Sequence, residues 1–308
     1  MKIFTITLNP AFDVHLGIER LKLHTENYAY SVAKHAGGKG VNISRALKSF
    51  GIENMPFLVL GKSGGAEFLD LLKKDGLLCR TIMTDGMVRE NITLHASDGE
   101  TRISTEGCEI SETIFEELFG SIKNECNENT IVTFTGRLPK GISKEKAAEF
   151  LLKIREFGLK VVVDCNSFSK DELFRIKPFL IKPNEQEIAQ LTGKKAENTE
   201  DALKLAEELC EKGIENVIVS LGEQGFSYCN KNHKFIISVP KVEVISTIGA
   251  GDSLIAGFVA GMIKGFGVEE TLRLAAAFGT AACRTVGTNP PQRKEIDKIF
   301  ERVICQKV

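Results

Sequence analysis

An aspartate that follows a glycine pair is the residue of this sequence best placed to do chemistry. Gly249-Ala250-Gly251-Asp252 precedes apolar residues at 255, 258, 259 and 262, which is the spacing of one helix face. The first N–H groups of a helix have no internal partner and lie at its positive end, so they can hold an anion. Phosphoryl transfer needs such donors beside a carboxylate that takes the proton of an attacking hydroxyl. A plain helix cap explains the same pattern.

A second glycine cluster lies near the N-terminus. Gly37-Gly38-Lys39-Gly40 stands before apolar residues at 43, 46, 47 and 50, so it also begins a helix. It lacks the GxxxxGK[ST] spacing of a P-loop and the GxGxxG of a dinucleotide fold. The cluster is therefore either another anion site or a turn with a cap.

Alternating strand and helix patterns must position these glycines. The sequence predicts an α/β fold with a mostly parallel central sheet and helices on both faces. Runs such as Val161-Val162-Val163 are apolar throughout, as strands buried on both sides should be. The predicted strands are Lys2–Leu8, Phe57–Leu60, Thr130–Thr135, Lys160–Asp164, Phe179–Ile181 and Asn216–Ser220, and the predicted helices include Lys144–Phe157, Thr199–Lys212, Asp252–Lys264, Glu269–Arg284 and Lys294–Ile304.

Two segments lack helical period and break this rhythm. Residues 12–36 and 87–105 contain short alternating runs, with a Ser-Asp-Gly turn at 97–99. They predict a small β-sheet outside the main one, acting as a lid. No linker, repeat or charge block divides the chain, so residues 1–308 are expected to form one domain.

Composition limits the partners. Lys plus Arg total 40 and Asp plus Glu total 41, a balance that gives no footprint for nucleic acid or a membrane surface. The longest uncharged stretch, Ser253–Ile263, is far shorter than the roughly 20 residues of a spanning helix. The eight cysteines form no CxxC pair, so we expect reduced thiols, no zinc site and a cytoplasmic location.

Five motifs then occur in order along the whole chain. They are Asn9-Pro10, Gly-Gly-Lys-Gly-Val-Asn at 37–42, Lys-Pro-Asn-Glu-Gln-Glu at 182–187, Ser-Leu-Gly at 220–222 and Thr-Ile-Gly-Ala-Gly-Asp-Ser at 247–253. Together they resemble the PfkB (ribokinase-like) carbohydrate kinases, most closely the 1-phosphofructokinase and tagatose-6-phosphate kinase branch. The resemblance implies a ribokinase-like fold with a small β-sheet lid, ATP and Mg²⁺ as cofactors, and Asp252 as catalytic base.

The resemblance also implies a role for each matching residue. The amides of Gly249, Ala250, Gly251 and Asp252 would form the anion hole. A carboxylate fixes sugar hydroxyls well, and arginine can clamp a phosphate with two hydrogen bonds. The substrate side would comprise Asp13, Gly37, Gly38, Lys39, Asn42, Arg89 and Asn91; the ATP side would comprise Lys182, Asn184, Ser220, Gly222, Gly225 and Gly279, with Glu187 holding Mg²⁺ through water.

Each assignment has a structural alternative. Asp13 could be a turn residue, Lys39 a solvated lysine and Arg89 a member of a surface salt bridge. Asn184 and Glu187 would equally form a helix cap with a first-turn Glu, and Gly279 a close helix contact.

The sequence departs from this family pattern at several positions. Tyr28 and Ala29 stand where many relatives place a basic residue, and Arg137 stands where relatives usually have Ser. We therefore predict that Arg137 reaches the sugar-phosphate pocket and replaces the missing lid cation; a surface arginine is the alternative. Asp164-Cys165-Asn166-Ser167 also differs from the commoner motif.

The predicted reaction is ATP-dependent phosphorylation of fructose 1-phosphate. Tagatose 6-phosphate is the alternative substrate, followed by fructose 6-phosphate or a free sugar. Outside the enzyme class, a non-catalytic sugar-phosphate sensor would keep Asp13 and the glycines but should lack Asp252, and a nicotinamide dehydrogenase would need an absent fingerprint. A homodimer through the lids is an expectation from the resemblance alone.

Overall fold

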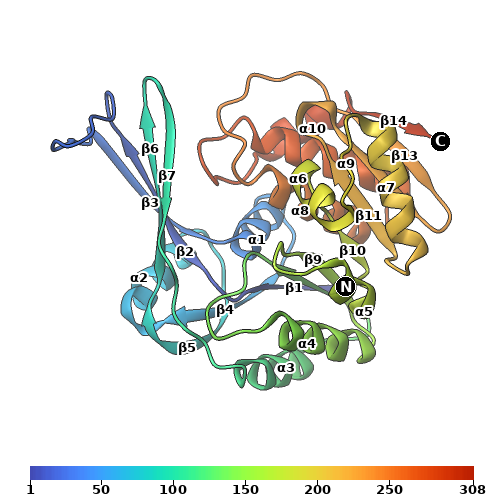
Figure 1. Cartoon of the computed structure of the whole chain (residues 1–308), viewed down its shortest axis with the longest axis horizontal. Coiled ribbons are helices and arrows are strands. Elements are labelled where there is room, and N and C mark those ends of the chain that lie inside the picture. The colour runs from blue at the N-terminus through green and yellow to red at the C-terminus, as the bar shows by residue number, and fades with distance from the viewer.

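A ten-stranded sheet with helices on both faces forms the body of the molecule in the computed structural model, which describes all 308 residues (Figure 1). Seven neighbouring strands are parallel, and a three-stranded antiparallel extension completes one edge. The strand order is β14 (Ile304–Lys307), β13 (Lys234–Ser238), β12 (Phe226–Asn230), β11 (Asn216–Ser220), β10 (Leu180–Ile181), β9 (Lys160–Asp164), β8 (Thr130–Thr135), β1 (Lys2–Thr7), β4 (Met55–Gly61) and β5 (Arg80–Met87).

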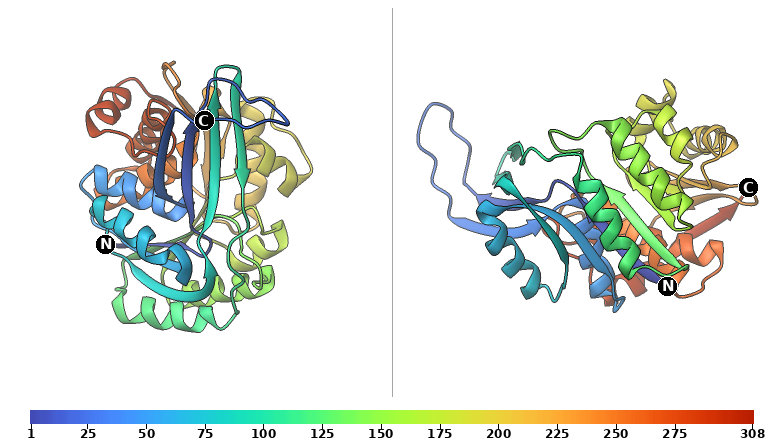
Figure 2. Two further views of the ribbon diagram at one scale, coloured as in Figure 1. Left: turned by 90° about the vertical axis from the view of Figure 1, so that its left-hand side faces the viewer. Right: turned by 90° about the horizontal axis from the view of Figure 1, so that it is seen from below.

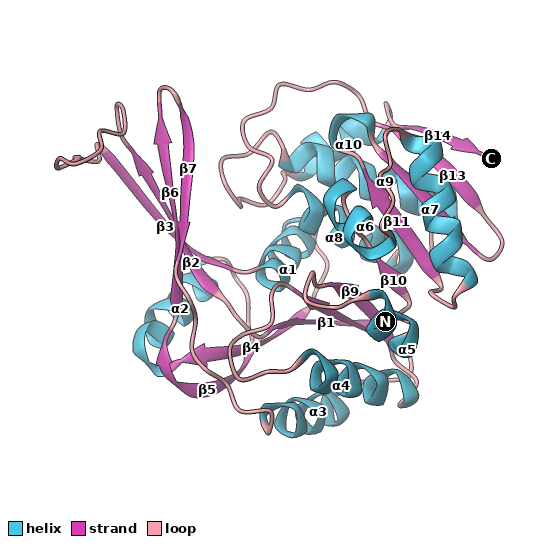
Figure 3. Cartoon of the chain, in the orientation of Figure 1, coloured by secondary structure: helices cyan, strands magenta, loops and turns pink.

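The helices form one layer on each face of this sheet (Figure 3). Each layer buries a continuous apolar core against the strands, as a parallel sheet requires. One layer consists of α3 (Ile114–Glu125), α4 (Lys144–Glu156), α5 (Lys170–Ile176), α6 (Glu185–Thr192) and α7 (Thr199–Glu211); the other consists of α1 (Lys39–Ser49), α8 (Ala250–Ile263), α9 (Val268–Ala282) and α10 (Arg293–Phe300).

A second sheet of four strands extends from one side of the body (Figure 2). We call β2, β3, β6 and β7 the lid sheet. Its strands run in the order β3 (Ser31–Gly37), β2 (Ala11–Gly17), β6 (Arg89–Ala96) and β7 (Gly99–Ser104). Helix α2 (Lys62–Lys74) joins its base to the main sheet, because Phe68 packs edge-on against Phe12 of β2.

The predicted fold class is confirmed, but the C-terminus was predicted wrongly. Helix α10 ends at Phe300, and Ile304–Lys307 forms strand β14 instead of the end of that helix. Strand β14 pairs with β13, so a long-range partner that the sequence pattern does not reveal decides its conformation. The β12–β13 hairpin and β5 were also not predicted.

Two further structural features concern the helices and the cysteines. No helix combines the length and the apolar content that crossing a membrane requires. All eight cysteines are free thiols.

Candidate active site

Asp252 lies in the first turn of α8, whose cap is Gly249. Gly249 has a φ of 82°, a left-handed conformation that glycine adopts without strain. The Asp252 side chain is buried, with 6% of its surface exposed. The N–H groups of Gly249, Gly251 and Asp252 have no acceptor, whereas that of Ala250 donates to the carbonyl of Thr247 at 3.3 Å. Of the four amides predicted to hold an anion, only that of Ala250 therefore already has a partner.

Burial sets the protonation of Asp252. It raises the pKa of the carboxyl to about 6, and the charge of Asp164 acts in the same direction. The ammonium of Lys39 and a hydrogen bond from Asn42 act in the opposite direction. A carboxylate with a pKa close to neutrality can both accept a proton and release it again, as a general base must.

Asn42 connects the two glycine-rich helix starts. Its Nδ2 donates to Oδ2 of Asp252 at 2.8 Å, and α1 packs against α8. The predicted residues Lys39 and Asn42 thus come to Asp252 from the first glycine cluster, more than 200 residues away in the sequence.

Asp252 interacts electrostatically with an ion cluster of one buried carboxylate, one buried lysine and one partly exposed lysine. Lys39 Nζ is 2.9 Å from Asp164 Oδ2, and Lys182 Nζ is 3.7 Å from Asp164 Oδ1. Burial alone would raise the pKa of Asp164, but the two ammonium groups outweigh it and lower that pKa. Burial likewise disfavours charged Lys39, yet Asp164 and Asp252 raise its pKa. Gly251 leaves room for this cluster, since a Cβ there would lie 3.0 Å from Lys182 Nζ.

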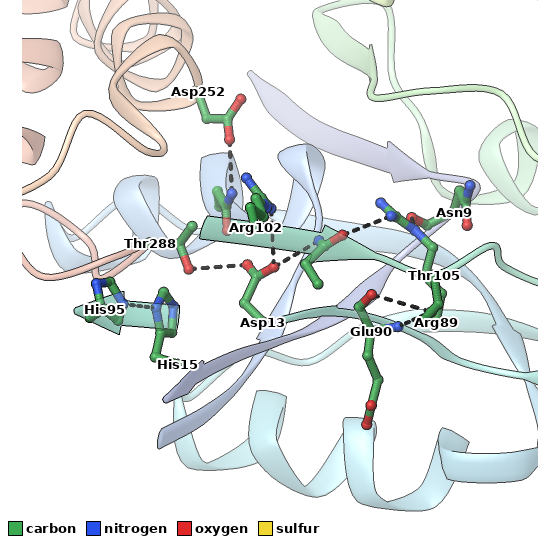
Figure 4. Close-up of polar contacts among 12 residues, drawn as sticks. Asn9, Asp13, His15, Arg89, Glu90, His95, Arg102, Thr105, Asp252 and Thr288 are labelled. Carbon is green, nitrogen blue, oxygen red and sulfur yellow. Dashed lines mark hydrogen bonds and ion pairs between the residues drawn. The ribbon is translucent and has the colours of Figure 1, made fainter. Parts of the chain in front are cut away.

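The lid sheet contributes a second polar cluster (Figure 4). Asn91 Nδ2 donates to Asp13 Oδ1 at 2.9 Å, and Asn91 Oδ1 accepts from Arg89 Nη1 at 2.9 Å. Asp13 and Asn91 are direct neighbours on β2 and β6. A Cβ at Gly37 would lie 2.2 Å from Asp13 Oδ2, so the missing side chain makes room for the carboxylate.

Three residues of the site were missed by the sequence reasoning. Thr288 Oγ1 donates to Asp13 Oδ2 at 3.3 Å, and Arg102 Nη2 lies 3.7 Å from Asp13 Oδ1. Nothing in the sequence marks these two positions, because only the fold brings them to Asp13. The sequence could have identified Asp164, because it is the last residue of a buried parallel strand and open α/β sheets bind ligands at the carboxyl ends of such strands.

Arg137 is exposed and makes no hydrogen bond or ion pair. Burial lowers the pKa of Arg89, and the charges of Arg102 and Arg137 add to this effect while Asp13 opposes it. Arg137 is therefore within electrostatic reach of the lid cluster. Its predicted contact with a sugar phosphate stays a prediction.

A cavity of about 580 Å³ opens beside the ion cluster, at the carboxyl ends of β9 and β10. Asp164, Lys182 and Glu187 line it. Asn184 and Glu187 form a reciprocal capping box at the start of α6: each side chain accepts from the other's backbone N–H at 2.9 Å. The capping role that the sequence left open is therefore present, and it occupies one oxygen of Glu187.

The carboxylates of this cavity suit Mg²⁺, which does not need a closed cage of protein ligands. No group of three or more His, Cys, Asp or Glu residues is arranged to hold a metal. Mg²⁺ usually keeps several waters and takes only one or two protein carboxylates. Glu187 would supply one of them through water, whereas both oxygens of Asp164 already face the ammonium groups of Lys39 and Lys182.

The other residues predicted to bind ATP do not line this cavity. Ser220 N–H donates to the carbonyl of Pro183 beside Asn184. A Cβ at Gly225 would lie 1.9 Å from the carbonyl oxygen of Ile237, and one at Gly279 would lie 3.3 Å from that of Ala250. Close packing against a backbone carbonyl therefore explains the absence of a side chain at both positions. Gly222 adopts a φ of 57° in a short 3₁₀ turn and Gly38 a φ of 123° before α1.

Comparison with known proteins finds relatives along almost the whole chain. The model of the pfkB family of carbohydrate kinases matches residues 12–295. A 1-phosphofructokinase of Vibrio cholerae is 30% identical over 98% of this chain and 96% of its own length, and one of Borreliella burgdorferi is 34% identical over 91% of each. The structure of Escherichia coli phosphofructokinase-2 in complex with potassium superposes with a TM-score of 0.90, at 25% identity and 98% coverage of both chains.

The match spans the lid cluster, the ion cluster and Asp252, and therefore includes the whole candidate site. The chain belongs to the pfkB family of carbohydrate kinases, which transfer a phosphoryl group to an alcohol acceptor.

Proposed function

We propose that this protein transfers the γ-phosphoryl group of ATP to the free primary hydroxyl of fructose 1-phosphate, giving fructose 1,6-bisphosphate. The observation that carries this proposal is the buried carboxylate of Asp252 beside the unpaired N–H groups of Gly251 and Asp252. The 1-phosphofructokinases among its relatives favour fructose 1-phosphate as the sugar.

The residues around Asp252 have defined tasks in this reaction. Asp252 accepts the proton of the sugar hydroxyl while the hydroxyl oxygen bonds to the γ-phosphorus of ATP. The bond between that phosphorus and the bridging oxygen breaks, and ADP leaves with this oxygen. The N–H groups of Gly251 and Asp252 stabilise the charge on the transferring group. The Asn42 amide keeps the Asp252 carboxylate turned toward the first helix start.

The lid cluster holds the sugar in this proposal. Asp13 accepts hydrogen bonds from sugar hydroxyls, and Arg89 binds the phosphate already on the substrate. Lys39, which the sequence also predicted for this phosphate, is instead paired with Asp164 in the ion cluster. Asn91 orients both Asp13 and Arg89, because it donates to one and accepts from the other.

The cavity beside the ion cluster receives the phosphates of ATP. Lys182, which is 5% exposed, presents its ammonium between Gly251 and Asp164. Bound Mg²⁺ would neutralise charge on the phosphates, and Glu187 is the carboxylate that would hold it, through water.

A coupled ADP-release assay tests the proposal. The purified protein is given MgATP with fructose 1-phosphate, tagatose 6-phosphate, fructose 6-phosphate or fructose, and D252N is the control. Fructose 1-phosphate should give the highest kcat/KM. A higher value for tagatose 6-phosphate would replace the substrate, and no sugar-dependent ADP release would refute the function.

We also infer that two copies associate through the outer face of the lid sheet. Val32 on β3 and Ile103 on β7 are 68% and 52% exposed. Val14 and Ile92 lie between them on the same face and are only half-buried. Such an apolar face is costly in water and is typical of an association surface.

Light scattering during size-exclusion chromatography tests this association. The wild-type protein should elute at twice the chain mass, and Ile103→Asp should elute as a monomer because it places a charge in the interface. A wild-type protein that stays monomeric at micromolar concentration would contradict the inference.

A further inference from the structure

The face of the lid sheet that is turned toward the body is polar. The pairing register places Asp13 beside Asn91, and His15 beside Thr93, which in turn lies beside Arg102. Side chains at paired positions share one face, so Arg102 of the edge strand β7 lies on the same face as Asp13. This face meets the segment after α9, because Thr288 donates to Asp13.

Arg102 on β7 reaches across one strand, β6, to the carboxylate of Asp13 on β2. Its Nη2 is 3.7 Å from Asp13 Oδ1, and this is its one ion-pair contact within 4.0 Å. The distance exceeds that of a hydrogen bond, so the contact is a loose ion pair. The Arg102 side chain is 44% exposed while that of Asp13 is 6% exposed, so a solvent-accessible guanidinium lies over a buried carboxylate.

Figure 4 shows the Arg102 guanidinium beside one oxygen of the Asp13 carboxylate and Thr288 beside the other. A sugar whose hydroxyls bind Asp13 would therefore lie next to Arg102.

The carboxylate that faces Arg102 is shared with other donors. Arg102 and Arg137 are near enough for their charges to lower the pKa of Arg89, whose burial acts in the same direction. Asp13 is the one carboxylate within ion-pair distance of Arg102, and it also accepts hydrogen bonds from Asn91 and Thr288. Arg89 and Arg102 thus share the Asp13 carboxylate, whose oxygens also serve Asn91 and Thr288, so an anionic ligand would find guanidinium donors that Asp13 does not fully engage.

We propose that Arg102 is a specificity-determining ligand of the substrate phosphate, held on Asp13 in the empty site and transferred to the phosphate when sugar hydroxyls bind Asp13. This inference rests on the proposed function, since it assumes a sugar phosphate. A dianionic phosphate accepts charge-assisted hydrogen bonds from a guanidinium, so it is a stronger partner than a carboxylate 3.7 Å away.

The test compares Arg102→Ala with Arg20→Ala. Arg20 is the matched control because it also belongs to the lid region, is 72% exposed and pairs with Asp98 instead of Asp13. Binding of fructose 1-phosphate to the protein without ATP is measured by calorimetry, and turnover is measured by ADP release. Arg102→Ala should weaken binding and raise the sugar-phosphate KM by about tenfold or more, as expected for one lost charge-assisted hydrogen bond.

The same variants should leave the rest of the reaction intact. The kcat at saturation and the KM for ATP should stay within about twofold of wild type, and the loss with free fructose should be smaller, because that sugar lacks the phosphate. Arg20→Ala should match the wild type. Arg102→Gln, which keeps length without charge, should repeat the loss and replaces the alanine variant if that variant does not fold.

The outcomes separate the two proposals. Unchanged binding in Arg102→Ala or Arg102→Gln overturns this inference alone. Tighter binding also overturns it, because Arg102 would then only obstruct Asp13. A wild-type protein that binds sugar phosphates without releasing ADP refutes the proposed function, while calorimetry still decides the role of Arg102. If it binds none of them, both proposals are refuted.

Discussion

Asn42 Nδ2 donates a hydrogen bond of 2.8 Å to Oδ2 of Asp252 and so joins the starts of α1 and α8. Both helices begin after glycines, and each carries one residue of the pair in or near its first turn. The hydrogen bond stabilises the ionised carboxylate and limits its rotation. Two glycine-rich motifs that lie far apart in the sequence thus form one site.

Removal of the Asp252 carboxylate should abolish most activity. In Asp252→Asn the side chain keeps its shape but cannot accept the hydroxyl proton, so kcat should fall about 10²- to 10⁴-fold. Steady-state ADP release measures the loss, and an unchanged far-UV circular dichroism spectrum shows that the fold is retained. Full activity in this variant would refute the assignment of the base.

Activity should fall as the pH is lowered through about 6. Burial raises the pKa of Asp252 to about 6, so below that pH the carboxyl is protonated and cannot act as a base. The Asn42 hydrogen bond lowers this pKa, so its removal in Asn42→Ala should move the acidic limb of the kcat/KM profile to higher pH. A limb that stays in place or moves to lower pH would show that Asp252 does not control it.

Asp164 should stabilise the fold through its two lysines. Asp164→Asn leaves Lys182 buried without a carboxylate, and breaking a buried pair in this way costs about 3 kcal/mol or more. Because the folded-state pKa of Asp164 is lowered, the stabilisation exists above its unfolded value and is lost as the pH falls through the folded one.

Urea unfolding monitored by circular dichroism measures this loss. Asp85→Asn is the control, since it breaks the exposed pair with Lys62 and should leave the unfolding midpoint unchanged. Equal midpoints for wild type and Asp164→Asn would contradict the prediction.

A side chain at position 37 should damage sugar binding. The Cβ of Gly37→Ala would lie 2.2 Å from Asp13 Oδ2 and must displace that carboxylate. A shift of about 1 Å in a positioning group can cost up to about 100-fold, so the sugar-phosphate KM should rise at least tenfold with little change in the KM for ATP. Gly120→Ala, where the new Cβ meets no atom within 4 Å, should behave like wild type.

The alternation of apolar strands and amphipathic helices was enough to predict the class of fold. Strands Thr130–Thr135, Lys160–Asp164 and Asn216–Ser220 have the bounds that the sequence predicted. Their signals are local, since a short apolar run bounded by turn residues indicates a buried strand without reference to distant residues. Strand β14 was missed because its conformation depends on pairing with β13.

The motifs by themselves determined the kind of chemistry, since a carboxylate beside glycine-rich helix starts is a property of neighbouring residues. Only the tertiary structure decided the surroundings that tune it: the burial that raises the Asp252 pKa, the bridge that Asp164 makes between Lys39 and Lys182, and the approach of Arg102 and Thr288 to Asp13. The physical reason is that desolvation and ion pairing depend on atoms within a few ångströms, which here come from residues as many as 275 positions apart.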